Sequence, residues 1–450
     1  TTSPICSALT VDPKPMTDRP NSQPAQSRPT GGRYAVLALI AIGTTINYLD
    51  RTLLSVAAPS MAKELGIGAV TMGLVFSAFS WSYALAQVPG GIFLDRMGVR
   101  ITYFLSVAFW SVFTALQGFS TGLVSLIAYR LGLGAAEAPC FPANSRVLVT
   151  WFPQRERARA NSVYSVGMYF GIAFLSPVLF WITETLGWRA LFIIVGAVGI
   201  VFAGIWYWLY RDPHHSQWVN QAELDLIAEG GGGSGPDSKA FAWSDVRWLL
   251  KQRQIFGASI GQFATNSTLV FFLTWFPTYL ATERHMAWLK VGFFAVLPFI
   301  AASVGVLVGG QVSDALVKRS GSATFGRKLP IVGGLFLSST IVSAAFLKSD
   351  LLVIAVMSVA FFGQGMVNLG WTLLTDIAPK PLIGLTAGMF NLCANLAGIV
   401  TPLVIGFVVA ATGSFVWALG FITVVALIGV FSYSVILGPV VRIEMPTTGE

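Results

Sequence analysis

The stretch Asn47-Tyr48-Leu49-Asp50-Arg51 lies inside an apolar run that extends from about residue 34 to residue 59. It places an acid and a base where the hydrocarbon of a membrane would be. An ionised side chain at the centre of a membrane helix costs about 2.5 to 3.5 kcal/mol on insertion scales, and such residues usually face a bundle interior or a water-filled pathway. The stretch therefore predicts a membrane helix that borders a polar path through the protein.

The composition supports a membrane protein. Of the 450 residues 54% are hydrophobic and only 11% are charged, and the mean hydropathy is +0.70. Soluble domains carry about 25% charged residues. The net charge of +8 could indicate nucleic-acid binding, but the basic residues cluster in short connections between apolar runs. Membrane topology explains that pattern, so we expect the lipid bilayer as a partner and no nucleic acid.

Twelve apolar runs are long enough to cross a bilayer, which takes about 20 residues. We therefore predict an all-α membrane protein with twelve transmembrane helices. The runs lie near residues 34 to 58, 71 to 94, 102 to 120, 123 to 144, 158 to 181, 188 to 210, 254 to 280, 289 to 312, 328 to 347, 350 to 374, 382 to 408 and 415 to 438.

The chain also repeats itself. Gly91-Ile92-Phe93-Leu94-Asp95 ends the second run and Gly310-Gln311-Val312-Ser313-Asp314 ends the eighth, and basic residues follow each. Two six-helix bundles related by a repeat, with a site near the membrane midplane, are typical of alternating-access transporters. Asp95, Arg96 and Asp314 are expected to hold helices together at one membrane face and so to act in gating.

The domain boundaries follow from these runs. We predict a disordered tail at 1–33, a first bundle at 34–210, a linker at 211–253, a second bundle at 254–440 and a tail at 441–450. In the linker, residues 221–227 resemble a short surface helix with solvated acids, and residues 230–236 a flexible glycine-rich joint. Alternate loops carry most Lys and Arg on the side of both termini, which predicts that the termini and the linker are cytoplasmic.

Arg51 is the candidate residue for binding an anion. It shares one helical face with Asn47 and Tyr48, whereas Asp50 lies about 100° around the helix. The planar guanidinium suits a carboxylate in a bidentate arrangement, and its charge is permanent. Asp50 and Arg51 therefore have separate roles or partners on other helices. The alternative is that they only pin helices together.

Arg130 and Glu137 form a second charged set in the fourth run. They are seven residues apart, on one helical face and about 10 Å apart along the axis, so they can line one cavity. Burial raises the pKa of a carboxyl and a nearby cation lowers it, so Glu137 or Asp50 could exchange a proton as the site opens to either side. This is the chemistry of proton coupling, and the sequence leaves open which acid carries the transported proton.

The second half offers amides and an aromatic side chain at helical spacing. Amides both donate and accept hydrogen bonds, which suits a hydrophilic substrate that carries hydroxyl groups. The alternative is that they join helices within the membrane. Tyr48 and Tyr83 of the first half could add hydroxyl groups to the same site. The second-half residues at this spacing are Gln262 with Asn266, then Gln364 with Asn368 and Trp371, and then Asn391 with Asn395.

Several motifs carry a family resemblance. Residues 91–100, GIFLDRMGVR, resemble the loop signature of the major facilitator superfamily. The segments NYLDR at 47–51, FSAFSW at 76–81, QVPGG at 87–91 and EAPCFP at 137–142 resemble the anion:cation symporter family within it. The similarity runs from about residue 33 to residue 442 and extends to bacterial carriers of D-galactonate and of glucarate or galactarate.

The resemblance implies roles for single residues. Arg51 would hold the substrate carboxylate, and Asp50 and Glu137 would handle protons. Met168 stands where the related carriers have Gln, so one hydrogen bond to the substrate is expected to be missing. The residues implied to line the polyol site are Tyr48, Tyr83, Gln262, Asn368, Trp371 and Asn391.

We therefore predict a proton-coupled symporter of a bacterial inner membrane that imports an organic anion, a hexonate such as galactonate or a hexarate such as glucarate. It would work as a monomer, with the proton as coupling ion and no other cofactor or metal. The sequence contains no nucleotide-binding loop, HExxH pair or nucleophile elbow, so we expect no enzyme. The alternatives are a carrier of another carboxylate, such as a dicarboxylate or phthalate, and a transporter-like sensor.

Overall fold

The computed structural model describes residues 28–231 and 243–445, apart from several side chains between residues 155 and 170. Every regular element within those ranges is helical. The α-helices are α1 (Gly32–Leu65), α2 (Ala69–Gln117), α3 (Leu123–Glu137), α4 (Cys140–Trp151), α5 (Gln154–Leu209), α6 (Gln221–Glu229), α7 (Trp243–Lys251), α8 (Arg253–Thr274), α9 (Phe276–Thr282), α10 (Trp288–Ser320), α11 (Ala323–Ser339), α12 (Asp350–Met366), α13 (Gly370–Ile377), α14 (Ile383–Thr412) and α15 (Val416–Phe431).

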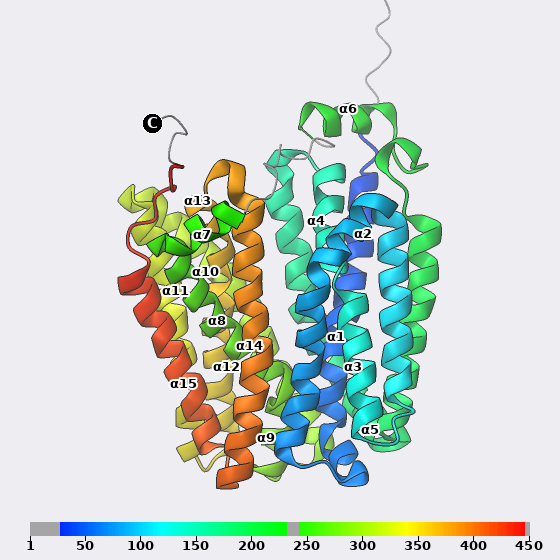
Figure 1. Cartoon of the computed structure of the whole chain (residues 1–450), viewed down its shortest axis with the longest axis vertical. Coiled ribbons are helices and arrows are strands. Elements are labelled where there is room, and N and C mark those ends of the chain that lie inside the picture. The colour runs from blue at the N-terminus through cyan, green and yellow to red at the C-terminus, as the bar shows by residue number, and fades with distance from the viewer. Residues whose placement is uncertain (1–27, 232–242, 446–450) are drawn as a thin grey trace, which may run out of the picture.

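The helices form two bundles that stand side by side (Figure 1). Helices α1 to α5 make the first half and α8 to α15 the second. Helix α6 lies across one end of the first half, and α7 lies at the same end of the second. We call this the linker end, and the opposite end, where α9 lies, the α9 end. Both helices belong to the connection between the halves. Residues 232–242 of this connection, which include most of the predicted glycine-rich joint, lie outside the described ranges. Residues 1–27 of the predicted tail also lie outside them.

Eight helical segments in the described part are long and apolar enough to cross a membrane. Two long helices each contain a break. Gly98 in α2 has φ 73° and Gly187 in α5 has φ 85°, both in the left-handed region that glycine tolerates. Each helix therefore consists of two helical segments joined at a glycine. Gly98 lies within the GIFLDRMGVR motif, so that motif forms a turn at the linker end.

The two halves meet closely at the α9 end. Helix α2 packs on α14 and α5 packs on α10. A Cβ atom on Gly73 of α2 would lie 2.5 Å from the carbonyl oxygen of Pro402 in α14, so the backbones touch where a side chain has no room. Small residues allow membrane helices to approach in this way.

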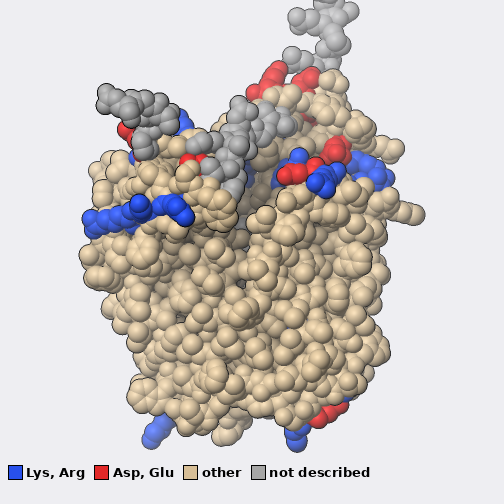
Figure 2. All heavy atoms as spheres, viewed as in Figure 1, with Lys and Arg blue, Asp and Glu red and all other residues tan. Residues whose placement is uncertain are grey.

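Aromatic side chains complete this closure. The ring of Phe76 lies 5.3 Å from that of Trp275, and the ring of Phe180 lies 4.9 Å from that of Trp288, each pair joining one half to the other. Within the second half, Phe415 also packs on Trp275. At the linker end the surface is instead hollowed between the halves (Figure 2). The cleft between the halves therefore opens at the linker end and is sealed at the α9 end.

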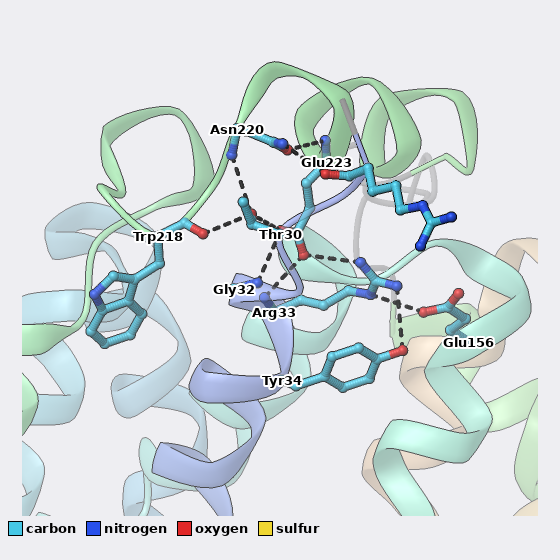
Figure 3. Close-up of polar contacts among 9 residues, drawn as sticks. Thr30, Gly32, Arg33, Tyr34, Glu156, Trp218, Asn220 and Glu223 are labelled. Carbon is cyan, nitrogen blue, oxygen red and sulfur yellow. Dashed lines mark hydrogen bonds and ion pairs between the residues drawn. The ribbon is translucent and has the colours of Figure 1, made fainter. Parts of the chain in front are cut away.

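Helix α6 is joined to the first helix through Glu223 (Figure 3). The Glu223 carboxylate accepts hydrogen bonds from the backbone N–H groups of Gly32 and Arg33, at 2.9 and 3.2 Å, and from Thr30 Oγ1 at 2.5 Å. Arg33 Nη1 forms an ion pair with it at 2.9 Å. Helix α1 has no side-chain cap of its own at Gly31, so Glu223 supplies the anion that a helix N-terminus favours.

This arrangement corrects one expectation from the sequence. A surface helix is present at residues 221–229, but the acid Glu223 is fully buried rather than solvated. Burial raises the pKa of Glu223, but the hydrogen bonds from Thr30, Arg33 and Gly32 outweigh it, so the net pKa lies below the usual value. The lowered pKa means that the contact stabilises the fold above the ordinary glutamate pKa and is lost as the pH falls below it.

We predict that Glu223→Ala lowers the free energy of unfolding by about 1 to 3 kcal/mol, because it leaves buried donors without an acceptor. Thermal unfolding of the purified protein measures the change. Asp225→Ala on the same helix is the control, because Asp225 is exposed. The difference between wild type and Glu223→Ala should be constant near neutral pH and shrink below about pH 4. Equal melting temperatures for both variants at pH 7 would contradict the capping role.

Candidate functional site

Arg51 and Glu137 form an ion pair inside the first half. Arg51 projects from the middle of α1 and Glu137 from the last turn of α3. Arg51 Nε donates to Glu137 Oε1 at 2.8 Å, and Arg51 Nη2 contacts the same oxygen. The Glu137 side chain is fully buried, whereas that of Arg51 is 18% exposed. Arg51 is thus held by an acid from another helix and keeps an edge open to its surroundings.

Four aromatic rings surround the Arg51 guanidinium. Its carbon lies 5.0 Å from the ring centroid of Tyr48, 4.8 Å from Phe79, 5.1 Å from Tyr83 and 5.9 Å from Phe141. Aromatic faces attract cations, most strongly where water is excluded. The sequence had singled out the two tyrosines but neither phenylalanine. Phe79 precedes Tyr83 by four residues on α2, and this spacing is the signal that could have identified it.

Asp50 and Arg130 lie deeper in the same half. Asp50 is 2% exposed and faces Trp110 and Thr114 of α2, away from Arg51. Arg130 Nη2 lies 3.5 Å from the carbonyl oxygen of Phe76, and the Arg130 guanidinium carbon is 5.3 Å from the ring centroid of Phe79. Two acids and two arginines therefore lie in one buried region of the first half.

Burial makes these charges costly in free energy unless each is paired. Removing one partner of a buried ion pair usually costs about 3 to 5 kcal/mol, because the other charge is left without compensation.

Glu137 Oε2 and both amide atoms of Asn47 are buried and have no hydrogen-bond partner among the described residues. Asn47 lies beside Glu137. The group thus contains spare donors and acceptors around a titratable carboxyl.

The candidates of the second half form a separate set. Gln262 of α8 is 6% exposed, and Asn391 of α14 is partly buried. Asn368, in the short 3-10 helix Val367–Leu369, is exposed. Trp371 of α13 packs its ring 5.0 Å from that of Phe390. Among the described contacts, none joins these four residues directly to Arg51 or Glu137.

The residues expected to act in gating form ion pairs at the linker end. Asp95 Oδ1 lies 2.6 Å from Arg146 Nη1 of α4. Asp314 Oδ1 lies 2.9 Å from Arg327 Nη1, and Arg327 Nε also pairs with Asp376 at 3.1 Å. Arg96, the third candidate, is exposed. Each of these pairs lies within one half, so none of them bridges the cleft in this arrangement.

Two further expectations concern what the site contains. Met168 lies in α5, but its side chain is outside the described part of the structure. The described residues contain no group of three or more His, Cys, Asp or Glu side chains placed to hold a metal ion. The chemistry of the described site therefore comes from two carboxyls, two guanidinium groups and the aromatic rings around them.

Comparison with known proteins agrees with this architecture. Residues 40–322 match the family model of the Major Facilitator Superfamily. The fold also resembles the crystal structure of a bacterial homolog of the human lysosomal transporter Spinster. The TM-score is 0.72 at 20% sequence identity, over 91% of this chain and 98% of that one.

Sequence relatives span nearly the whole chain. The D-galactonate transporter of Escherichia coli O6:H1 is 45% identical over 427 residues, covering 93% of this chain and 98% of the relative. The probable galactarate/D-glucarate transporter GudP of Escherichia coli K12 is 42% identical over 446 residues, covering 95% and 99%. The protein of that name in Bacillus subtilis is 41% identical, covering 92% and 94%. This chain is an integral membrane transporter rather than an enzyme, and it belongs to the major facilitator superfamily.

Proposed function

We propose that this protein is a proton-coupled symporter that imports a sugar acid, a hexonate such as galactonate or a hexarate such as galactarate or glucarate, by alternating access. The observation that carries the proposal is the buried pair of Arg51 and Glu137. It sets a permanent cation, suited to a carboxylate, against an acid that can take up a proton. Protonation of Glu137 would free Arg51 for the substrate carboxylate, so the proton and the anion would bind together.

The substrate class rests on the relatives and on the chemistry of the site. Relatives that are 41 to 45% identical carry names for transport of galactonate, galactarate and glucarate. Arg51 would bind the carboxylate. Tyr48 and Tyr83 stand next to it with phenolic hydroxyls. We propose that Gln262, Asn368, Trp371 and Asn391 meet the hydroxyl-bearing end of the substrate from the other half.

Coupling follows from exchange of the anion on Arg51. When Glu137 takes up a proton, it loses its charge and its hold on the guanidinium. The substrate carboxylate then replaces it, so one negative charge on Arg51 is exchanged for another. When the substrate leaves toward the cytoplasm, Glu137 releases its proton there and pairs with Arg51 again. Asp50, near Arg130, is the second acid of the group and the alternative carrier of the proton.

Access alternates, in this proposal, through rocking of the two halves. The chain would cross the membrane twelve times, with α2 and α5 contributing two spans each. If the linker end is cytoplasmic, as the positive-inside rule predicts, the cleft opens to the cytoplasm here. Opening to the outside requires the contacts of Phe76 with Trp275 and of Phe180 with Trp288 to separate. Asp95, Arg96 and Asp314 would then stabilise the closed linker end.

Uptake into proteoliposomes tests the function. Radiolabelled galactonate or glucarate should accumulate when the outside is made acidic, and a protonophore should abolish the accumulation. Phthalate and a C4 dicarboxylate, added as competitors, distinguish carriers of other acids. Accumulation that is independent of the pH gradient would contradict the coupling. Stronger competition by phthalate than by any sugar acid would contradict the substrate class.

We predict that Arg51→Lys reduces uptake by about ten- to a hundredfold although the positive charge is kept. Lysine cannot reproduce the planar fork, and a hydrogen bond to a charged group is worth about 1.5 to 3 kcal/mol. Initial uptake rates across substrate concentrations measure the loss. Arg319→Lys, an exposed position at the end of α10, is the matched control. Uptake by Arg51→Lys at the control level would rule out the carboxylate role.

We predict that Glu137→Gln abolishes proton-driven accumulation and leaves substrate exchange across the membrane. The amide keeps the shape of the side chain and an acceptor for Arg51 but cannot gain or lose the transported proton. Accumulation under a pH gradient and counterflow without one are compared in the same vesicles. Glu184→Gln, at an exposed position, controls for the change of charge. Full accumulation by Glu137→Gln would assign the proton to another group.

A further inference from the structure

One aromatic ring contacts both arginines of the site. The centroid of the Phe79 ring lies 4.8 Å from the guanidinium carbon of Arg51 and 5.3 Å from that of Arg130. Phe79 is 6% exposed, so water scarcely reaches the contact. Two like charges therefore lie close together in the first half with the same ring beside each.

The position of this ring is fixed by the packing of α2 on α3. Gly134 lies between Arg130 and Glu137 on α3. A Cβ atom there would lie only 2.3 Å from the carbonyl oxygen of Phe79. The two backbones thus touch at the level where the ring meets the charges. Tyr83 stacks on Phe79 with centroids 5.3 Å apart and planes at 25°, which limits rotation of the ring.

The ring supplies what these cations lack. Arg130 Nε and Nη1 are buried and have no hydrogen-bond partner among the described residues. The Nε and Nη2 groups of Arg51 both donate to Glu137. An aromatic face carries negative charge density and attracts a guanidinium, and the attraction grows when water is excluded. The Phe79 face compensates part of both charges without contributing an anion that would compete with the substrate.

We propose that Phe79 is a positioning residue for substrate binding, which orients Arg51 toward the carboxylate and holds Arg130 as a separate cation, so that Glu137 pairs with Arg51 alone. The proposal rests on the proposed function, because it assigns Arg51 to the substrate. It explains why an aromatic residue with no polar group lies at the centre of a charged cluster. A ring that only filled space would be replaceable by any apolar side chain of similar size.

Fluorinated phenylalanines at position 79 test this directly, because successive fluorine atoms weaken the attraction of the ring for cations while its shape changes little. The full-length protein is purified with mono-, di- and trifluorophenylalanine at this position. We expect the Kd for galactonate to rise stepwise, by about tenfold over the series. The same series at Phe202, a buried ring elsewhere in the first half, is the control and should leave the Kd unchanged.

Conventional variants give a second readout. Phe79→Tyr keeps an aromatic face and should bind within about twofold of wild type, whereas Phe79→Leu should lose about tenfold. The loss should appear in Kd and KM, with a smaller change in the maximal rate of uptake. A Kd that is as insensitive to fluorination at 79 as at 202 would overturn the role of Phe79. Failure of the wild-type protein to bind any sugar acid would instead overturn the proposed substrate class.

Discussion

The ion pair between Arg51 and Glu137 is the constraint on which the rest of the first half depends. Two charges are buried in a chain whose other spans are largely apolar, and neither can lose its partner cheaply. The surroundings respond with aromatic faces on the cation and with close contact of α2 and α3 at Gly134. A pair that is costly to break is also one whose replacement by another anion can be selective. In the proposed mechanism, the same electrostatic demand that shapes the fold would also select the substrate anion.

The two ends of the molecule differ in the kind of contact that holds them. At the α9 end the halves meet through aromatic rings and a backbone contact at Gly73, which form and separate without leaving a charge unpaired. At the linker end the recorded ion pairs of Asp95 and Asp314 stay within their own halves. The Asp95–Arg146 pair is exposed on both sides, and exposed pairs contribute little to stability, whereas Arg327 in the Asp314 pair is mostly buried. Apolar contacts at one end and ion pairs at the other would suit the proposed rocking of the two halves.

Hydropathy and charge placement predicted much of the fold, because each span must satisfy the membrane on its own. The membrane character, the helical class and the buried charges at 50, 51, 130 and 137 could all be read from the sequence. The pairing of Arg51 with Glu137 could not, because helical spacing ranks neighbours on one helix and these residues are 86 positions apart. Phe79 is one of 33 phenylalanines, so composition gave no reason to select it. Glu223 was expected to be solvated, because its partners at the start of α1 are far from it in the sequence.

The contact of Glu223 with the start of α1 also orders events in time. The first helix begins at residue 32, but the anion that caps it is made only when the chain has reached residue 223. By then every helix of the first half has been synthesised, and none of the second. Domains generally fold as units during synthesis, N-terminal first. The cap joins the first helix to a segment that follows every helix of the first half, so it can form without any residue of the second half.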